Sequence, residues 1–327
     1  MYDYKIGSFN VNNMSFRSDP DKFKYIAEII KDQKYQIVAL QEVLTEGKVW
    51  KTIDEQKRRF LRYYLGKDWE FCWAAPDRFK SSAPEDKRGE GYAFLWDKRF
   101  FTIPEYIKSP TDIREFEPRI VNQSENDVRA RLPKMARMPF YGRFIPVRGP
   151  FIEIRLINTH IFSGKNLSSD IAIRKEEFST LVRNVLPGIG DNVYGQNRRP
   201  YTVLLGDYNL SVRDKDIVQA VSGLNTDIDE FVFLDNGKAI KTIQKEKSTL
   251  KDPAGNKGNE TAAEESQDYS NSFDHFSVDI SWFEAEGVRI EASRLDVRNA
   301  LPNGVDLETY YKKISDHAPV ELNISMR

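Results

Sequence analysis

The chain has 327 residues, of which 40% are hydrophobic and 30% are charged, and its 49 basic and 50 acidic residues leave a formal net charge of −1. A chain of this length and composition is expected to bury a substantial core, but it lacks the excess positive charge that would hold it to nucleic acid without a local basic patch. Its single cysteine, Cys72, excludes an internal disulfide and predicts no disulfide-linked partner, and no segment approaches the roughly 20 apolar residues of a membrane span.

The N-terminal part of the chain predicts strands separated by helices. Residues 4–12 alternate apolar and polar side chains, as in a half-buried strand, and Ser18-Asp19-Pro20 is a helix-start signal before an apolar face at 23–30. The apolar run 37–43 predicts a buried strand. Further along we expect a helix over 48–65, a strand over 91–97 and an irregular, charged stretch over 98–135.

The alternation of strands and helices resumes at residue 150. We expect a strand over 151–161, a helix over 169–186 that Pro187 ends, and strands over 201–210, 273–283 and 317–324. Trp282 is expected in the core. Residues 244–272 are polar with almost no large apolar groups, which predicts a flexible surface excursion. No repeat or composition shift marks a boundary, so we expect one layered α/β domain spanning residues 1–327.

Polar side chains end nearly every predicted strand, where a buried strand would not favour them. A single carboxylate at such a position is most often a turn or helix-cap residue. Taken together, however, these ends offer carboxylates, imidazoles and carboxamides, which bind hard divalent cations and move protons near neutral pH. They are Asn10 and Asn12, Glu42, His160, Asp207 and Asn209, Asp274 and His275, and Asp316 and His317.

A series of seven motifs carries a family resemblance. The segments SFNVN, LQEV, GEGYAFLW, NTH, GDYN, FDHFSV and ISDHAPVE resemble the endonuclease/exonuclease/phosphatase superfamily, and within it the deoxyribonuclease I type, in the family's own order. The resemblance implies a four-layer α/β sandwich (α+β), in which two packed, mostly antiparallel sheets are flanked by helices. It also implies phosphodiester hydrolysis assisted by a divalent metal, Mg²⁺ in the first place, with Mn²⁺ or Ca²⁺ as alternatives.

The resemblance further implies residues that bind metal and substrate. The metal would be held by Glu42, with Asn10 nearby and Asp316 completing the cluster. The substrate phosphate would be contacted by Asn209 and Arg137, and Asn12 is a further candidate.

Catalytic roles follow from the same resemblance. His317 would be the catalytic imidazole, held by Asp274, and Asp207 would orient or deprotonate the attacking water. His160 would be a second imidazole with Glu90 as its partner. A carboxylate that holds a histidine fixes the tautomer of the ring, which suits these pairings. Which group acts as base and which as acid is left open.

Two positions depart from the deoxyribonuclease I pattern. Asn12 and Leu44 stand where that type carries DNA-gripping arginines, and this loss is expected to weaken binding to duplex DNA. Basic residues in 129–148, interleaved with Phe and Tyr, either compensate for it or form a solvated hairpin on the sheet edge. His275 follows Asp274 on a strand, so it is expected to face away from the site.

We therefore expect a metal-dependent, monomeric endonuclease that cuts DNA with low sequence specificity. The alternative is a superfamily phosphodiesterase or phosphatase that acts on a 5′-tyrosyl-DNA adduct, a phosphoinositide or a small phosphoester. A catalytically inactive binding module is disfavoured, because none of the core motif residues is missing. The N-terminus has no signal-peptide pattern, which favours a cytoplasmic protein, or a secreted one if a signal peptide was removed.

Overall fold

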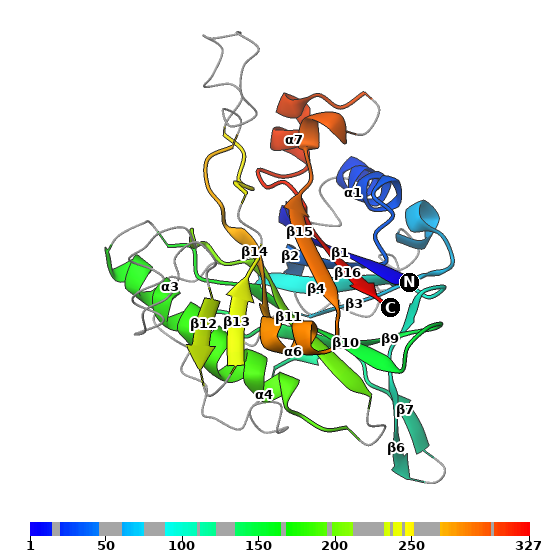
Figure 1. Ribbon diagram of the computed structural model, residues 1–327. Helices are drawn as coiled ribbons and strands as arrows, with labels where there is room; N and C mark the ends of the chain where they lie inside the picture. The colour runs from blue at the N-terminus through cyan, green and yellow to red at the C-terminus, as the bar shows by residue number, and fades with distance from the viewer. Residues whose placement is uncertain are drawn as a thin grey trace.

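The described part of the chain contains two large sheets, a small two-stranded one and all of the predicted site residues. The computed structural model describes residues 1–14, 20–45, 61–74, 89–109, 112–121, 135–164, 168–194, 198–211, 232–235, 238–243, 246–251, 269–301 and 304–327. Within them, two mixed β-sheets pack face to face and helices cover their outer faces (Figure 1). The molecule is thus an α/β sandwich, as the motifs predicted.

The first sheet has six described strands in the order β15-β16-β1-β2-β4-β3. Strands β1 and β2 are parallel and the other neighbours are antiparallel. The strands are β1 (Tyr2–Met14), β2 (Ile37–Thr45), β3 (Trp69–Ala74), β4 (Gly89–Asp97), β15 (Arg289–Arg294) and β16 (Val320–Met326).

The second sheet has eight described strands in the order β12-β13-β14-β11-β10-β9-β5, with β8 added beside β9. Strands β10 and β11 are parallel, and the remaining pairs are antiparallel. The strands are β5 (Phe101–Thr102), β8 (Arg119–Ile120), β9 (Phe140–Pro146), β10 (Ile152–His160), β11 (Arg199–Asp207), β12 (Val232–Asp235), β13 (Lys238–Thr242) and β14 (Asp274–Asp279). A separate hairpin pairs β6 (Glu105–Ser109) with β7 (Asp112–Glu115).

Helices cover both outer faces. Helices α1 (Pro20–Asp32) and α7 (Leu307–Lys313) contribute to the core on the outer face of the first sheet. The second sheet is covered by α3 (Ser168–Thr180), the π-helical turn η2 (Leu181–Val185) and α4 (Leu186–Gly190). A short helix α6 (Ile280–Ala285) follows β14, and a 3₁₀ turn η5 (Val297–Asn299) follows β15. None of the helices in the described ranges combines the length and apolar character needed to span a bilayer.

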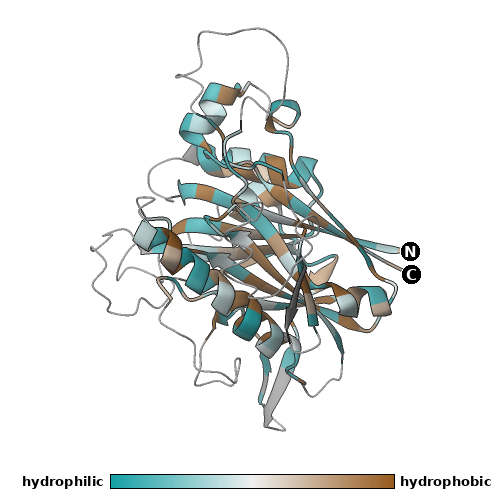
Figure 2. Ribbon diagram, turned by 60° about the vertical axis from the view of Figure 1, so that its left-hand side comes forward, coloured by the Kyte–Doolittle hydropathy of each residue, from teal (hydrophilic) through white to brown (hydrophobic). Residues whose placement is uncertain are grey.

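The core between the sheets is built from side chains that alternate along the strands. Ile6 and Phe94 of the first sheet belong to one buried cluster with Phe144 and Ile154 of the second, and the Phe94 and Phe144 rings are 5.4 Å apart. Alternate residues of a strand point to the same face, so each strand supplies every second side chain to this layer. Figure 2 shows hydrophobic positions gathered on the central strands.

Toward one end of the sheets the apolar packing gives way to a buried polar link. Gln41 Nε2 on β2 donates to Asn158 Oδ1 on β10 at 2.7 Å and to Ser8 Oγ on β1 at 3.2 Å. Asn158 Nδ2 in turn donates to the carbonyl oxygen of Leu40 at 2.9 Å. Buried amides need such partners, so these bonds set the spacing and register of the two sheets next to the predicted site.

The predicted helix over 169–186 does not end at Pro187. The backbone changes from α3 through the π-helical turn η2 into α4, which continues to Gly190 and carries Pro187 in its first turn. The proline stands just after the π-helical turn, where the backbone N of Leu186 donates to the carbonyl oxygen of Leu181 and the α-helical hydrogen-bond pattern is already interrupted. Of the helix predicted over 48–65, only 61–65 lie within the described residues, and they are helical.

The strand predicted over 273–283 is shorter than expected, since β14 ends at Asp279 and the chain turns into α6. As a consequence Trp282 is 39% exposed rather than part of the core, while Phe283 one position later is buried. The region 98–135, expected to be irregular, contains the short strands β5 to β8 in its described part. Short strands of two to five residues leave too little periodicity to be recognised in a sequence.

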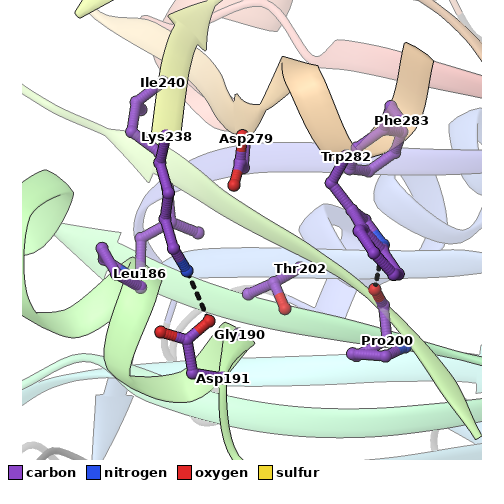
Figure 3. A pocket seen from close by; sticks show the side chains of 11 residues that line it. Leu186, Gly190, Asp191, Pro200, Thr202, Lys238, Ile240, Asp279, Trp282 and Phe283 are labelled. Atoms are coloured by element: carbon purple, nitrogen blue, oxygen red, sulfur yellow. Dashed lines mark hydrogen bonds and ion pairs between the residues drawn. The ribbon is translucent and has the colours of Figure 1, made fainter. Parts of the chain in front are cut away.

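A cavity of about 300 Å³ lies between α4 and α6, over the first half of β11 (Figure 3). Its walls include Trp282, whose Nε1 donates to the carbonyl oxygen of Pro200 at 2.8 Å, and an ion pair between Lys238 and Asp191. None of the predicted site residues lines it. The predicted site lies instead at the far end of β11, where Asp207 stands.

A substitution at Gly206 can test the close approach of β11 to β10. A Cβ at this position, where φ is 133°, would lie 2.0 Å from the carbonyl oxygen of Thr159. We expect Gly206→Ala to lower the free energy of unfolding by about 3 kcal/mol, measured by urea denaturation, because the backbone must move to admit the methyl group. The control is Gly287→Ala, where φ is also positive but nothing lies within 4 Å, and about 1 kcal/mol is expected. Equal losses would contradict the close approach.

Candidate functional site

Strands of both sheets bring their polar ends together at one place. On the second sheet, His160 is in register with Asp207, and Asp207 is in register with Asp274. The first sheet faces this row with residues of β1, β2 and β4. The residues that meet here are Asn10, Glu42 and Glu90 from the first sheet, His160, Asp207 and Asp274 from the second, and His317 from the segment before β16.

Asn10 joins the two sheets at the centre of this group. Its Nδ2 donates to Glu42 Oε1 at 3.0 Å and to Asp207 Oδ2 at 2.9 Å. Its Oδ1 accepts from the backbone N of Asn12 at 3.0 Å, so the amide group is held from both ends. Glu42 also accepts from the backbone N of Asn13 at 3.0 Å. The carboxamide therefore fixes where both carboxylates stand.

Residues with strained backbone, that is with positive φ, are concentrated at the same end of the sheets. Glu42 has φ of 57° at a register shift of the β2–β4 ladder, where a bulge turns the side chain out of the strand alternation. Of the five non-glycine residues with positive φ in the described ranges, four lie here: Asn12, Asn13, Glu42 and Asn209. Such conformations persist where the surroundings enforce them, and they are concentrated at functional sites.

Asp274 and His317 form a buried pair. His317 Nδ1 lies 2.7 Å from Asp274 Oδ2, and since a carboxylate only accepts, the imidazole is the donor. Burial by itself lowers the pKa of a histidine, but the charges of Asp274 and Asp207 outweigh it and raise the pKa of His317 to about 10. His317 is therefore an imidazolium at neutral pH.

Asp207 is a buried carboxyl group with a near-neutral pKa. Burial raises its pKa to about 7, against the opposing effect of the His317 charge, and Asp274 adds to the increase. Its Oδ2 lies 3.8 Å from His317 Nε2 and 3.7 Å from His160 Nε2, while Oδ1 accepts from the backbone N of Asn209 at 2.8 Å. A carboxyl group of this kind exchanges protons readily at neutral pH.

His160 lies between the carboxylates of both sheets. Its Nε2 is 3.8 Å from Glu42 Oε1, and its buried Nδ1 has no hydrogen-bond partner among the described residues. Burial, followed by the charges of Arg137 and His317, lowers the pKa of His160 well below its ordinary value. His160 is therefore a neutral imidazole.

The predicted pairing of Glu90 with His160 is only partly formed. Glu90 Oε2 lies 3.6 Å from His160 Nδ1, which is longer than a hydrogen bond, and the same oxygen accepts from Arg137 Nη2. Arg137 thus lies beside both residues, and its buried Nη1 has no hydrogen-bond partner in the described ranges. This leaves a guanidinium donor next to the cluster, which suits contact with a phosphate oxygen.

Asn209 lies just after β11, and Asn12 lies near the end of β1, at a register shift of the β1–β2 ladder. Asn209 Nδ2 donates to the carbonyl oxygen of Ile161 at 2.8 Å, which ties the end of β11 to the end of β10. The carbonyl oxygen of Asn12 accepts from Lys22 Nζ at 2.7 Å, so this part of β1 is joined to α1. Asp316 makes no hydrogen bond through its side chain to another described residue, but its charge raises the pKa of His317, which places it beside the cluster.

Two charged residues of α3 hold the loops around the cluster. Glu177 accepts from the backbone N of Ala136 at 2.5 Å and from that of Phe162 at 3.0 Å. Arg174 donates to the carbonyl oxygens of Phe162 at 3.0 Å and Asn209 at 3.3 Å. These bonds join the segments that carry Arg137, His160 and Asn209. Both residues are buried although they are charged, a feature that the pattern of the helix does not reveal.

The donor set fits a hard divalent cation. Several carboxylates and several cationic side chains meet at this end of the sheets, and partly buried carboxylates are stabilised by a cation close to them. The carboxylates are Glu42, Glu90, Asp207, Asp274 and Asp316, and the cationic side chains are Lys22, Arg137, Arg174 and His317. Carboxylate and carboxamide oxygens are the ligands that Mg²⁺, Mn²⁺ and Ca²⁺ prefer.

Three of these residues also form a compact group by themselves. Ligand atoms of Asp207, Asp274 and His317 lie within 4.8 Å of one another. However, Asp274 Oδ2 and His317 Nδ1 are hydrogen bonded to each other, so these atoms are occupied. This hydrogen bond leaves Glu42, next to Asn10, as the better candidate for the metal.

Several residues around the cluster were not predicted. Ser248 and Ser315 are buried and bond to Asp274 and Asn10 respectively, and the Tyr92 hydroxyl accepts from the backbone N of His160 at 3.1 Å. Ser315 lies within the ISDH motif and Tyr92 within GEGYAFLW, so their motifs were visible although their roles were not. Ser248 lies in the predicted surface excursion, where the sequence carries no signal.

His275 and the basic stretch 129–148 lie mostly away from the cluster. His275 Nε2 contacts the carbonyl oxygens of Leu210 at 3.0 Å and Ser272 at 2.8 Å, so this histidine is structural. In the described part of the stretch, Arg143 is buried in an ion pair with Glu153, and only Arg137 is in contact with the cluster. Leu44 stands at one of the two positions where the deoxyribonuclease I type carries an arginine, and it is buried.

Comparison with known proteins identifies relatives of this architecture. The profile of the Endonuclease/Exonuclease/phosphatase family matches residues 7–317, whereas no curated protein sequence matches the chain.

Solved structures with a similar fold include three proteins of low sequence identity. D. rerio TDP2, described as complexed with single strand DNA product, is 15% identical at a TM-score of 0.57, with 99% of each chain covered. An endonuclease/exonuclease/phosphatase from Bacteroides vulgatus is 14% identical at a TM-score of 0.52, with 100% of each chain covered. A functionally unknown conserved protein from Enterococcus faecalis V583 is 15% identical at a TM-score of 0.52, with 99% of this chain and 100% of that chain covered. At such identities the structural similarity supports the fold alone.

The two histidines of the cluster are expected to titrate very differently. The folded-state pKa of His317, about 10, exceeds its ordinary value. Its protonation therefore contributes stability that is fully present below about pH 6.5 and is lost as the pH rises through about 10. In ¹H–¹⁵N spectra of the metal-free protein, the His317 ring keeps both protons at neutral pH while His160 remains neutral.

Asp274→Asn provides the comparison, because it removes the carboxylate charge that raises the pKa of His317 most. The pKa of His317 then falls, and the ring loses a proton within the neutral range. A wild-type His317 that titrates at the pH of an ordinary histidine would contradict the assignment of the buried pair.

Proposed function

The chain belongs to the Endonuclease/Exonuclease/phosphatase family, and from this we propose that it is a divalent-metal-assisted phosphodiester hydrolase that cuts DNA as a low-specificity endonuclease of the deoxyribonuclease I type. The observation that carries the proposal is the joint geometry of Asn10, Glu42, Asp207, Asp274 and His317. One carboxamide positions two carboxylates from different sheets, and a carboxylate-held imidazolium stands beside one of them.

Hydrolysis of a phosphodiester needs an activated water, neutralisation of the charge that develops on phosphorus, and a proton for the leaving oxygen. Asp207, with a pKa of about 7, takes a proton from water at neutral pH. His317, with a pKa of about 10, places positive charge beside the phosphate and has a proton to donate. Asp274 keeps the ring oriented with Nε2 toward Asp207.

The remaining residues bind and position the substrate. Arg137 Nη1, which has no hydrogen-bond partner among the described residues, offers a donor for a phosphate oxygen, and Asn209 lies at the end of β11. His160 is neutral and its Nδ1 has no described partner, so it also has the capacity for one further hydrogen bond. A divalent cation bound by Glu42, with Asn10 and Asp316 beside it, would supply Lewis-acid neutralisation of the phosphate charge.

A second candidate substrate class is supported by the distribution of basic side chains. Asn12 and the buried Leu44 replace the arginines expected in a duplex-binding enzyme, and Arg143 is committed to Glu153. A site with few phosphate-contacting cations favours a short or non-duplex substrate. The alternative is therefore a phosphodiesterase for a 5′-tyrosyl-DNA adduct, a phosphoinositide or a small phosphoester, acting with the same residues.

Asp207→Asn tests the chemistry without changing the size of the side chain. We expect kcat toward a chromogenic phosphodiester to fall by about 10²–10⁴-fold, because the amide cannot accept a proton from water. The control is Asp279→Asn, an equal change at the start of α6 away from the cluster, which should keep wild-type activity. Equal activity in both variants, with both folded, would overturn the role of Asp207.

The substrate class is tested by a panel of phosphoesters assayed with magnesium and with EDTA. Nicking of supercoiled plasmid that requires magnesium is the expected result. Turnover confined to a 5′-tyrosyl oligonucleotide, an inositol phospholipid or a small ester would replace DNA by that substrate class. No turnover of any member would identify a binding module and overturn the proposal of an enzyme.

A further inference from the structure

Two segments of the predicted surface excursion lie against the candidate site. The stem segments, residues 246–251 and 269–272, pair with each other: the backbone N of Ser248 donates to the carbonyl oxygen of Asn271 at 2.7 Å. The rest of the excursion, 244–245 and 252–268, lies outside the described residues. Leu250 and Tyr269 are buried in the core on the outer face of the first sheet. The stem segments are therefore packed into the fold.

The first stem segment runs alongside the segment that carries His317. Thr249 forms an antiparallel bridge with His317, and the backbone N of Leu250 donates to the carbonyl oxygen of Asp316 at 2.7 Å. The backbone N of Ala318 donates to the carbonyl oxygen of Ser248 at 2.8 Å. Ser248 is thus fixed between the start of β14 and the catalytic imidazole.

The hydroxyl group of Ser248 makes three hydrogen bonds, although the side chain is fully buried. Oγ donates to Asp274 Oδ2 at 2.6 Å. The same oxygen accepts from the backbone N of Asp274 at 3.1 Å and from that of Phe273 at 3.3 Å. A hydroxyl group has one proton and two lone pairs, so all of its bonding capacity is directed to the start of β14.

Asp274 therefore has two side-chain partners on one oxygen. Oδ2 is shared by Ser248 Oγ and His317 Nδ1, at 2.6 and 2.7 Å, while the buried Oδ1 has no hydrogen-bond partner among the described residues. The orientation of the carboxylate consequently depends on the Ser248 hydroxyl on one side and on the imidazole on the other. Groups that hold an orienting carboxylate in this way tune the residue that it supports.

We propose that Ser248 is a positioning residue for His317 and acts through Asp274. With the hydroxyl in place, Oδ2 stays directed at Nδ1, so the ring keeps Nε2 toward Asp207 and the reacting phosphate. Without it, the carboxylate loses its second partner and two backbone amides lose their acceptor. The effect on turnover rests on the proposed hydrolytic function, whereas the effect on the hydrogen bond between Asp274 and His317 does not.

The test uses Ser248→Ala, which removes the hydroxyl, and Ser248→Cys, which nearly keeps its volume but is a weak donor. The matched control is Ser270→Ala in the second stem segment, because its hydroxyl donates to the carbonyl oxygen of Thr249 at 3.2 Å and accepts from Asn271 Nδ2 at 3.3 Å, away from Asp274. Each full-length variant is first checked for folding by urea denaturation. The ring proton on His317 Nδ1 is then observed by ¹H NMR in the metal-free protein, and kcat and KM are measured on the phosphoester that the wild type turns over.

We expect both Ser248 variants to shift or broaden the His317 ring-proton signal and to lower kcat by about 10–100-fold with KM nearly unchanged, while Ser270→Ala matches the wild type. An unchanged ring-proton signal in a folded Ser248→Cys protein would overturn the proposal. A kcat within about twofold of the wild-type value in that variant would do the same. If the wild type turns over no phosphoester, the proposed function fails, and the ring-proton signal alone decides the role of Ser248.

Discussion

The hydrogen bonds of Asn10 connect the two sheets at the point where the candidate site forms. One amide group donates to Glu42 of the first sheet and to Asp207 of the second, so the distance between these carboxylates is set by the packing of the sandwich. The buried link from Gln41 to Asn158 lies beneath it and maintains the same register. Any change in the spacing of the sheets would alter the distance between Glu42 and Asp207.

Burial then decides the protonation of the groups that this spacing brings together. Asp207 and His317 are both removed from water, yet the pKa of each moves upward, because the desolvated carboxyl group resists ionisation while the histidine gains two carboxylate neighbours. His160, at a similar depth, faces Arg137 and His317 and has its pKa lowered instead. The pKa values of three titratable side chains in one cluster are thereby set by burial and by neighbouring charges.

Much of the architecture was predictable, because strands and helices of ordinary length repeat their apolar residues with characteristic periods. The strands that became β1, β2, β4, β10, β11 and β16 were anticipated, and α1 followed its start signal. The short strands β5 to β8 and the continuation through Pro187 into α4 were not, since strands of two to five residues and a π-helical turn have no periodic pattern of their own. Trp282 was misplaced for a related reason: the chain leaves the strand at Asp279, and the apolar run does not show it.

The candidate site, like the fold, was predictable from the sequence only in part. The order of the motifs along the chain was enough to indicate the family and the residues that meet in the cluster, because strand ends of one sandwich converge whatever connects them. The sequence did not indicate which side chains form hydrogen bonds or ion pairs with one another. Glu90 is bound by Arg137 rather than held by His160, and Ser248, from a segment with the composition of a loop, is hydrogen bonded to Asp274. These contacts join residues that lie 47 and 26 positions apart, so they depend on the packing of the sheets and loops, which no local pattern encodes.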